Sequence, residues 1–361
     1  MVAWVKGKCI GQGSFAKVHL ALNTSANSLF AVKSAVCGSY QADALENEIN
    51  LLSSLSSPFV VEYLGDDVTV DASDGLRHRN LHMEYLPGSF VTMSGELSEG
   101  TVSAIVRCLV LALRYVHSCG IVHCDVKGGN VLMGRDCKTA KLADFGSAAM
   151  AGDQVIPRGS PLWMAPEVVR KEYQGPESDV WSLGCTVIEI LTGKTPWEDQ
   201  GFHTLYRIGF SAELPLFPIG LSELGRDFLE KCLRREKRMR WSCDQLLRHP
   251  FIASDCEIPE ASPRCVLSWY NLDPQIKEEE EHEWIASIGK ERIEELAGEE
   301  EPEAECDEDW EMVRSDTQQA SGLSSTLDES MPFVMETTNV SNSDMCTVFD
   351  CLIVIYMCIL N

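Results

Sequence analysis

The apolar positions of roughly the first 80 residues follow the pattern of β-strands. After a Gly-rich stretch at Gly11–Val18, short apolar runs indicate strands at Ser28–Lys33, Val60–Asp67 and Asn80–Glu84. One helix interrupts them at Ala42–Leu55, because its leucines and isoleucine recur at steps of three and four. This part of the chain is therefore predicted to be a strand-rich lobe with a single helix.

Helical periodicity dominates from about residue 100 onward. Helices are predicted at Thr101–Ser118, Asp179–Thr192, Thr204–Phe210 and Gly220–Arg234. Strands that precede helices, rather than alternating with them, indicate an α+β arrangement of two lobes.

The charge of the chain is concentrated in its last third. Residues 252–361 hold 27 of the 55 acidic residues and only 5 of the 30 basic ones. We therefore expect a globular part that ends at Phe251 and an acidic, mostly disordered tail over 252–361. Such a tail repels nucleic acid and anionic membrane surfaces, so neither is an expected partner.

The 15 cysteines show no CxxC pair and no regular spacing, which favours free thiols in a reducing compartment. No secretory signal pattern opens the sequence. The apolar run Cys351–Leu360 is too short to span a bilayer, so stable membrane insertion is not expected. We expect a protein of the cytoplasm, the nucleus or both.

The Gly-rich stretch is the first candidate for chemistry. Gly11 and Gly13 allow the backbone to approach phosphate oxygens, although two glycines near a strand are more often a turn. Lys33 then lies within an apolar strand, where it either extends to water or pairs with phosphates. The second reading needs a helix carboxylate, for which Glu48 is the candidate and Glu46 the competitor facing another side.

The loop His123–Leu132 carries the strongest signal. Asp125, Lys127 and Asn130 supply a base, a phosphate-binding cation and a metal ligand, and the carboxylate of Asp144 follows fourteen residues after Asn130. Phosphoryl transfer needs in-line positioning and cancellation of charge on the transferred group, which these side chains offer together.

With these motifs the chain resembles the eukaryotic protein kinases over residues 4–251. The resemblance implies ATP and Mg²⁺ as cofactors, Asp125 as catalytic base, Lys127 and Lys33 as phosphate-binding cations, and Asn130 and Asp144 as metal ligands. Glu167 is expected to pair with Arg240. The implied nucleotide-binding residues are Ile10, Gly11, Gln12, Gly13, Ser14, Phe15, Ala16, Val18, Ala31, Lys33, Glu48, Met83, Glu84, Leu86 and Leu132.

Further motifs resemble the plant MEKK-type MAP kinase kinase kinases. They are the segment Gly159–Glu167, the loop His123–Gly128 and the endings Asp244–Leu247 and His249–Phe251. This resemblance implies a serine/threonine kinase that phosphorylates the activation loop of MAP kinase kinases. Two alternatives stay open: a serine/threonine kinase outside that cascade, and a pseudokinase scaffold that only binds partners.

Three residues depart from the family pattern. Ala16 replaces the third glycine of the loop, and Ser160 replaces the commoner threonine, whose hydroxyl the family places near Asp125 and Lys127. Cys124 replaces the arginine before the catalytic aspartate, which normally receives an activation-loop phosphate. A neutral thiol cannot bind that phosphate, so the usual phosphorylation switch lacks its partner.

Overall fold

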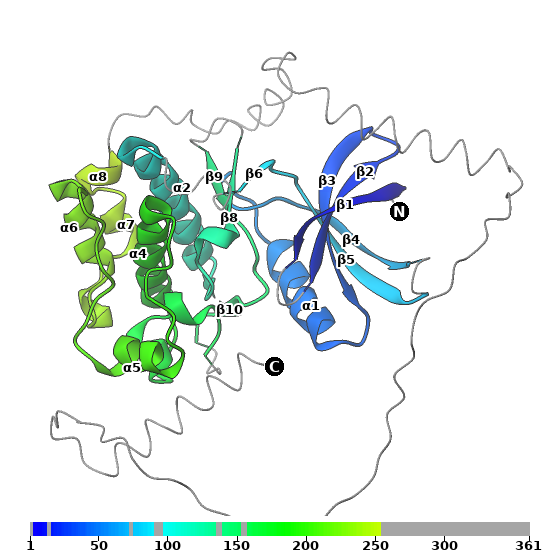
Figure 1. The fold of residues 1–361 in the computed structure, drawn as a ribbon. Coiled ribbons are helices and arrows are strands. Elements are labelled where there is room, and N and C mark those ends of the chain that lie inside the picture. The colour runs from blue at the N-terminus through cyan, green and yellow to red at the C-terminus, as the bar shows by residue number, and fades with distance from the viewer. Residues whose placement is uncertain are drawn as a thin grey trace, which may run out of the picture. The chain divides into compact units, whose positions relative to one another are not determined.

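The structure, a computed structural model, describes residues 3–12, 16–71, 75–89, 97–134, 139–152 and 157–253. They form two lobes, one built on a β-sheet and one on helices (Figure 1). The predicted α+β arrangement is confirmed. The predicted tail lies outside the described residues from Ser254 onward.

The first lobe is built on an antiparallel sheet with the strand order β1-β2-β3-β5-β4. Its strands are β1 (Trp4–Gln12), β2 (Lys17–Asn23), β3 (Ser28–Val36), β4 (Tyr63–Val70) and β5 (Arg77–Met83). The register places Val18 of β2 beside both Gly11 and Lys33, and Ala31 of β3 beside Met83 of β5. Strand pairing alone thus gathers five residues of the predicted site.

Helix α1 (Tyr40–Leu52) packs against this sheet and buries Leu45, Ile49 and Leu52 as predicted. It begins at Ser39, whose hydroxyl accepts a hydrogen bond from the backbone N–H of Ala42. The helix ends three residues before the predicted Leu55. Serine hydroxyls beyond Leu52 bond to the last carbonyls of the helix and compete with its continuation.

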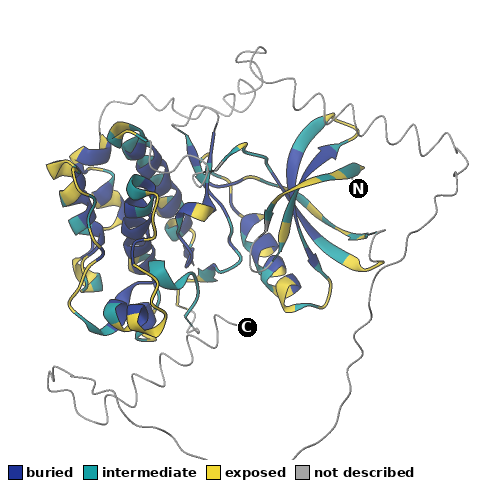
Figure 2. Ribbon diagram, in the orientation of Figure 1, coloured by how far each residue is buried: buried dark blue, intermediate teal, exposed yellow. Residues whose placement is uncertain are grey.

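The second lobe is built around two buried helices, α2 (Glu99–Ser118) and α4 (Pro176–Thr192), dark blue over much of their length in Figure 2. Apolar side chains of both helices are buried, with Trp181 fully buried. The remaining helices are α3 (Pro166–Val169), α5 (Phe202–Phe210), α6 (Glu223–Cys232), α7 (Cys243–Leu246) and α8 (Pro250–Ala253), with the 3₁₀ turns η2 (Gly128–Asn130), η3 (Pro161–Trp163) and η4 (Lys237–Met239).

Two small sheets carry the loops of the site. One has the order β6-β8-β9 and the other pairs β10 with β7. Their strands are β6 (Gly88–Ser89), β7 (Ile121–Val122), β8 (Val131–Met133), β9 (Ala140–Leu142) and β10 (Ala149–Met150).

The prediction that a strand begins at Val60 was wrong, because β4 begins at Tyr63. Residues before Tyr63 bond instead to β9 of the helical lobe: Val61 N–H donates to Leu142 O at 3.0 Å, and Leu142 N–H donates to Phe59 O at 2.9 Å. The apolar run Phe59–Val61 therefore ties the two lobes together rather than extending the sheet.

By length and composition, α2 is long and apolar enough to cross a membrane, and no other helix among the described residues is. Its apolar residues are the core of the helical lobe, with Val102, Ile105, Leu109 and Leu113 fully buried. Core packing therefore accounts for its hydropathy.

The predicted pair of Glu167 with Arg240 is confirmed as a buried, bidentate ion pair. Arg240 Nη1 and Nη2 donate to the two carboxylate oxygens at 2.6 and 2.7 Å, and both side chains are almost fully buried. Burial by itself would raise the pKa of Glu167, but the bonds from Arg240 outweigh it and lower the pKa. The pair joins the start of α3 to the end of η4.

Arg240→Met should therefore lower the free energy of unfolding by about 3–5 kcal/mol, because it leaves the Glu167 carboxylate buried without its cation. Urea unfolding measures this loss. Lys6→Met is the matched control, since Lys6 pairs with Asp71 at 2.8 Å but its side chain is 39% exposed; the expected loss there is below about 1 kcal/mol. Equal losses in the two variants would contradict the assignment.

Candidate active site

Lys33 of β3 lies between two carboxylates from different parts of the chain. Its Nζ is 2.7 Å from Glu48 Oε2 on α1 and 2.8 Å from Asp144 Oδ1 in the loop after β9. Glu48 also accepts a hydrogen bond from the backbone N–H of Phe145 at 3.1 Å. These three contacts join the sheet, helix α1 and the loop Asp144–Gly146.

The competitor Glu46 faces another side, as the helical period predicted. It accepts a hydrogen bond from Arg79 Nε of β5 at 2.8 Å and its side chain is 49% exposed. Glu48 is buried and is the helix carboxylate in contact with Lys33.

The charges of Lys33 and Asp144 stabilise each other. Burial would lower the pKa of Lys33, but Glu48 and Asp144 outweigh it and raise the pKa. Burial would raise the pKa of Asp144, but attraction to Lys33 lowers it. At neutral pH the site therefore presents an ammonium and an ionised carboxylate, the pair needed to hold phosphate and a divalent cation.

The predicted nucleotide-binding residues lie on the strands and on the connection between the lobes. Gly11 and Val18 lie on β1 and β2, Ala31 on β3, and Leu132, half-buried, on β8.

Met83 ends β5 and is followed by half-buried Glu84, Tyr85 and Leu86. Ile10 and Gln12 end β1 and Ala16 precedes β2, whereas Gly13, Ser14 and Phe15 lie outside the described residues.

The side chain of Glu84 holds the connection between the lobes in place through two hydrogen bonds. Its Oε1 accepts the backbone N–H of Glu62 at 2.7 Å and a bond from Lys141 Nζ at 2.5 Å. Lys141 belongs to β9, next to β8 and Leu132. The connection is thereby anchored to both lobes.

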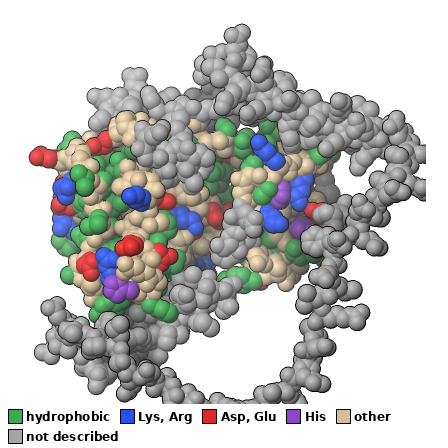
Figure 3. Space-filling model, viewed as in Figure 1, with side chains coloured by type: hydrophobic (Ala, Val, Ile, Leu, Met, Phe, Trp, Pro, Cys, Tyr) green, Lys and Arg blue, Asp and Glu red, His purple; other side chains and the backbone are tan. Residues whose placement is uncertain are grey.

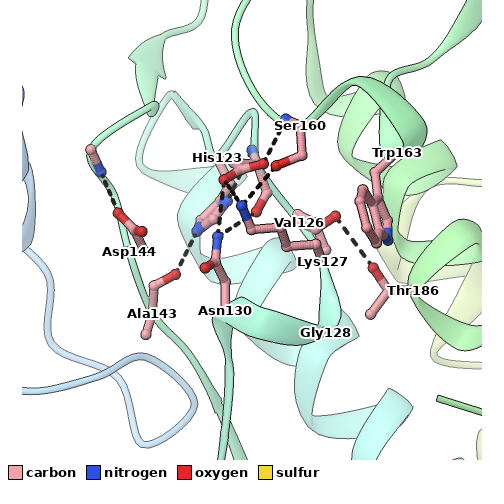
Figure 4. A network of polar contacts seen from close by, with 12 residues as sticks. His123, Val126, Lys127, Gly128, Asn130, Ala143, Asp144, Ser160, Trp163 and Thr186 are labelled. Atoms are coloured by element: carbon pink, nitrogen blue, oxygen red, sulfur yellow. Dashed lines mark hydrogen bonds and ion pairs between the residues drawn. The ribbon is translucent and has the colours of Figure 1, made fainter. Parts of the chain in front are cut away.

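Lys127 and Asn130 lie close together between β7 and β8 (Figure 4), and Asp125 of the same loop contacts both. Lys127 Nζ is 2.9 Å from Asp125 Oδ2, and Asn130 Nδ2 donates to the same oxygen at 3.2 Å. The other oxygen, Asp125 Oδ1, accepts the backbone N–H of Ser160 at 2.8 Å. The carboxylate is thus held in one orientation by three donors.

Ser160 contacts this loop differently from the expectation for its hydroxyl. Lys127 Nζ donates to Ser160 Oγ at 2.7 Å (Figure 4), while Asp125 receives the backbone N–H of Ser160 rather than its hydroxyl. The predicted contact with Lys127 is confirmed. The side chain of Ser160 positions the lysine, and its backbone positions the carboxylate.

Two carboxylates on α4 that sequence reasoning missed accept hydrogen bonds from the backbone of the loop His123–Asn130. Asp179 accepts backbone N–H groups from His123 and Cys124 at 2.8 and 2.9 Å. Glu189 accepts from Gly128 N–H at 2.8 Å and Trp163 Nε1 at 2.9 Å. The signal for them was an acidic residue within a helix that is otherwise apolar, because a buried charge requires partners.

Comparison with known proteins now decides the family. The protein kinase domain model matches residues 4–252. The chain belongs to the protein kinase family. Among curated relatives, mitogen-activated protein kinase kinase kinase 17 of Arabidopsis thaliana is 42% identical over 71% of this chain and 71% of its own length. Mitogen-activated protein kinase kinase kinase 18 of the same plant is 39% identical over 78% of this chain and 89% of its own length.

Relatives outside plants are also similar to the kinase. Mitogen-activated protein kinase kinase kinase A of Dictyostelium discoideum is 32% identical over 74% of this chain and 30% of its own length. The predicted resemblance to plant MEKK-type serine/threonine kinases is confirmed. The enzyme uses ATP, as its family does, together with a divalent cation.

The oxygens of the kinase site fit such a cation. Asp144 offers a carboxylate and Asn130 an amide oxygen, the hard ligands that Mg²⁺ prefers. Within the described ranges no three His, Cys, Asp or Glu side chains cluster to hold a metal by themselves.

Cys124 of the kinase is buried and has a left-handed backbone, with φ of 66°. Burial and the nearby Asp179 raise the pKa of its thiol, so it stays neutral at physiological pH. The expectation that this position offers no charge for a loop phosphate therefore agrees with its surroundings.

The activation segment of the kinase packs directly on Cys124 through Gly159. A Cβ atom at Gly159 would lie 2.0 Å from the carbonyl oxygen of Cys124, and its φ is 103°. Only glycine permits this approach. The close contact sets the position of Ser160, the next residue, against Asp125 and Lys127.

Arg158 is held by its own set of bonds. The side-chain amide of Gln174 accepts from Arg158 N–H at 3.2 Å and donates to Arg158 O at 3.1 Å. The guanidinium donates to Ala148 O at 3.1 Å, and Asn47 of α1 donates to the same oxygen, also at 3.1 Å. The carbonyl of Ala148 therefore links the first part of the activation segment to Arg158 near its end and to Asn47 of α1, and no phosphate is needed for these bonds.

These contacts predict a graded response at Ser160. Ser160→Thr should keep its activity because the hydroxyl remains. Ser160→Ala should lower kcat about tenfold, because Lys127 loses a charge-assisted hydrogen bond while the backbone bond to Asp125 persists. Ser160→Asp should lower kcat further, because a second carboxylate beside Asp125 repels it and competes for Lys127.

The measurement is kcat and the KM for ATP of the purified variants on one protein substrate, with melting temperature as the folding control. An unchanged KM for ATP is expected, since Ser160 contacts Asp125 and Lys127 and none of the predicted nucleotide-binding residues. Full activity in Ser160→Asp would contradict the positioning role.

Proposed function

We propose that this kinase acts as a MAP kinase kinase kinase: it transfers the γ-phosphoryl group of ATP to serine or threonine in the activation loop of a MAP kinase kinase. The observation that carries the proposal is the complete set of kinase side chains in a chain similar to MAP kinase kinase kinases: Lys33 contacts Glu48 and Asp144, and Asp125 contacts Asn130. A pseudokinase scaffold would have no need to keep all these groups in place.

Asp125 is assigned as the base. Its carboxylate, oriented by Lys127, Asn130 and the Ser160 N–H, accepts the proton of the substrate hydroxyl as that oxygen bonds to the γ-phosphorus and the bond to ADP breaks. Lys127 and Lys33 offset negative charge on the phosphates. Bound Mg²⁺, held by Asn130 and Asp144, would neutralise the remaining phosphate charge.

The thiols support a location in the cytoplasm or the nucleus as part of the proposal. Cys124, Cys185, Cys232 and Cys243 are free thiols, and all four are buried. Free thiols persist where glutathione and thioredoxin keep the compartment reducing.

We also propose that the active arrangement forms without an activation-segment phosphate. Gly159 packing, the Gln174 bonds to Arg158 and the shared Ala148 carbonyl supply the ordering that a phosphate bound to arginine supplies elsewhere. Cys124 offers no charge to a phosphate.

A panel of MAP kinase kinases tests the substrate class. Each would be supplied as a catalytically inactive protein, and the phosphorylated residues would be mapped by mass spectrometry. We expect rapid phosphorylation within the activation loop of at least one member and none by Asp125→Asn, which keeps the size of the side chain but not the base.

Phosphorylation of a general substrate such as myelin basic protein, with no MAP kinase kinase modified, would overturn the cascade assignment and leave the kinase assignment standing. Activity of Asp125→Asn near that of the wild type would instead overturn the assignment of the base.

A further inference from the structure

Helix α1 carries Glu48, and the orientation of the helix decides whether this carboxylate reaches Lys33. The helix packs on the sheet through an apolar stripe of Leu45, Ile49 and Leu52, all buried. Apolar burial is non-directional, so it constrains rotation of the helix about its own axis less than hydrogen bonds do. The polar residues beside the stripe therefore decide where Glu48 points.

Glu46 and Glu48 lie on opposite sides of the apolar stripe. Successive residues of an α-helix are about 100° apart, which places Glu46 roughly 100° to one side of Leu45 and Glu48 roughly 60° to the other side. Glu48 contacts Lys33 on β3, and Glu46 contacts Arg79 on β5. Two ion pairs to two strands thus hold the helix from both sides.

The guanidinium of Arg79 bonds to α1 and to β4 at the same time. Its Nε and Nη2 donate to the two carboxylate oxygens of Glu46 at 2.8 and 3.5 Å. Its Nη1 donates to Asp66 Oδ2 at 2.5 Å and to Asp67 O at 3.2 Å. Asp66 is held in turn by a hydrogen bond from the hydroxyl of Tyr63. Arg79 therefore joins α1 to the two outer strands of the sheet.

Arg79 and Lys33 belong to the same rigid sheet. In the pairing of β3 with β5, Lys33 lies opposite Leu81 and Ala35 lies opposite Arg79. Arg79 and Leu81 share one face of β5, because alternate residues of a strand point to the same side. The sheet thus fixes Arg79 relative to Lys33, and the helix between their two partners is the part that can turn.

Arg79 differs from a lone charge at the surface. Basic side chains, in blue, stand at the surface of the sheet lobe in Figure 3, at the right of the view, whereas the Arg79 side chain is only 17% exposed. Water screens its contacts less, and its planar guanidinium holds two carboxylates in defined directions. Glu46 itself is 49% exposed, so we expect a smaller effect than a fully buried pair would give.

We propose that Arg79 is a positioning residue for the ATP site: through Glu46 it sets the rotation of α1 and thereby holds Glu48 against Lys33. The inference rests on the assignment of Lys33 as a phosphate-binding cation, and it does not depend on which protein the kinase phosphorylates. Without Arg79, α1 divides its time between this arrangement and a rotated one. The affinity for ATP then falls in proportion to the fraction of molecules in the competent arrangement.

The dissociation constant of the fluorescent analogue mant-ATP, in excess Mg²⁺ and with the full-length protein, tests the proposal. Arg79→Met should raise this Kd about fivefold, as expected when the competent arrangement falls to about a fifth of the population. Glu46→Gln should act in the same direction. The double variant should be no weaker than the weaker single variant, because both changes remove the same contact. An unchanged Kd in Arg79→Met would overturn the proposal.

Glu48→Gln shows whether Arg79 acts through Glu48. This change alone should weaken mant-ATP binding, and adding Arg79→Met should weaken it no further. A Kd that Glu48→Gln leaves unchanged would overturn the assignment of the Lys33–Glu48 pair and the inference with it. Weaker binding in Glu48→Gln together with a full additional loss on adding Arg79→Met would overturn the role of Arg79 alone.

Two further variants separate positioning from loss of folded protein. Lys6→Met removes an ion pair of the sheet lobe that does not include α1, and it should leave the Kd unchanged. Arg79→Lys keeps the charge and should recover part of the affinity that Arg79→Met loses. Unfolding would lower the number of binding sites at an unchanged Kd, and that result in Arg79→Met would contradict positioning.

Discussion

The catalytic loop of this kinase depends on one buried carboxylate, Asp179. Its two oxygens accept hydrogen bonds from the backbone of His123 and Cys124 and from His117 Nε2 at 2.8 Å. Burial would lower the pKa of His117, but the bond to Asp179 outweighs it and raises the pKa to about 10, so the ring is protonated at neutral pH. The resulting buried ion pair holds the loop from α4.

The hydrogen bonds to Asp179 offset the free-energy cost of the left-handed backbone conformation at Cys124. A left-handed conformation costs a residue other than glycine roughly 1–2 kcal/mol, and Cys124 adopts it with its N–H bonded to Asp179. The same conformation directs the Cys124 carbonyl toward Gly159. The contact between Asp179 and the loop therefore supports the position of the base directly and that of Ser160 through Gly159.

The sequence predicts this site where the chemistry is local. The helical period separates Glu48 from Glu46, and the spacing within His123–Asn130 brings base, cation and amide together. The sequence does not reveal the hydrogen bonds that Asp179 or Gln174 makes, because these bonds join residues distant in the chain and leave no periodic pattern. The segment Phe59–Val61 could not be assigned for the same reason. Its apolar residues do not indicate which lobe its backbone will bond to.

The central claim is that this kinase orders its activation segment through its own side chains and backbone. It is tested most directly by the specific activity of protein made in bacteria, before and after complete dephosphorylation by a phosphatase that is then removed. The account predicts equal activity in the two preparations. Loss of activity on dephosphorylation, with recovery when the activation segment is phosphorylated again, would contradict it.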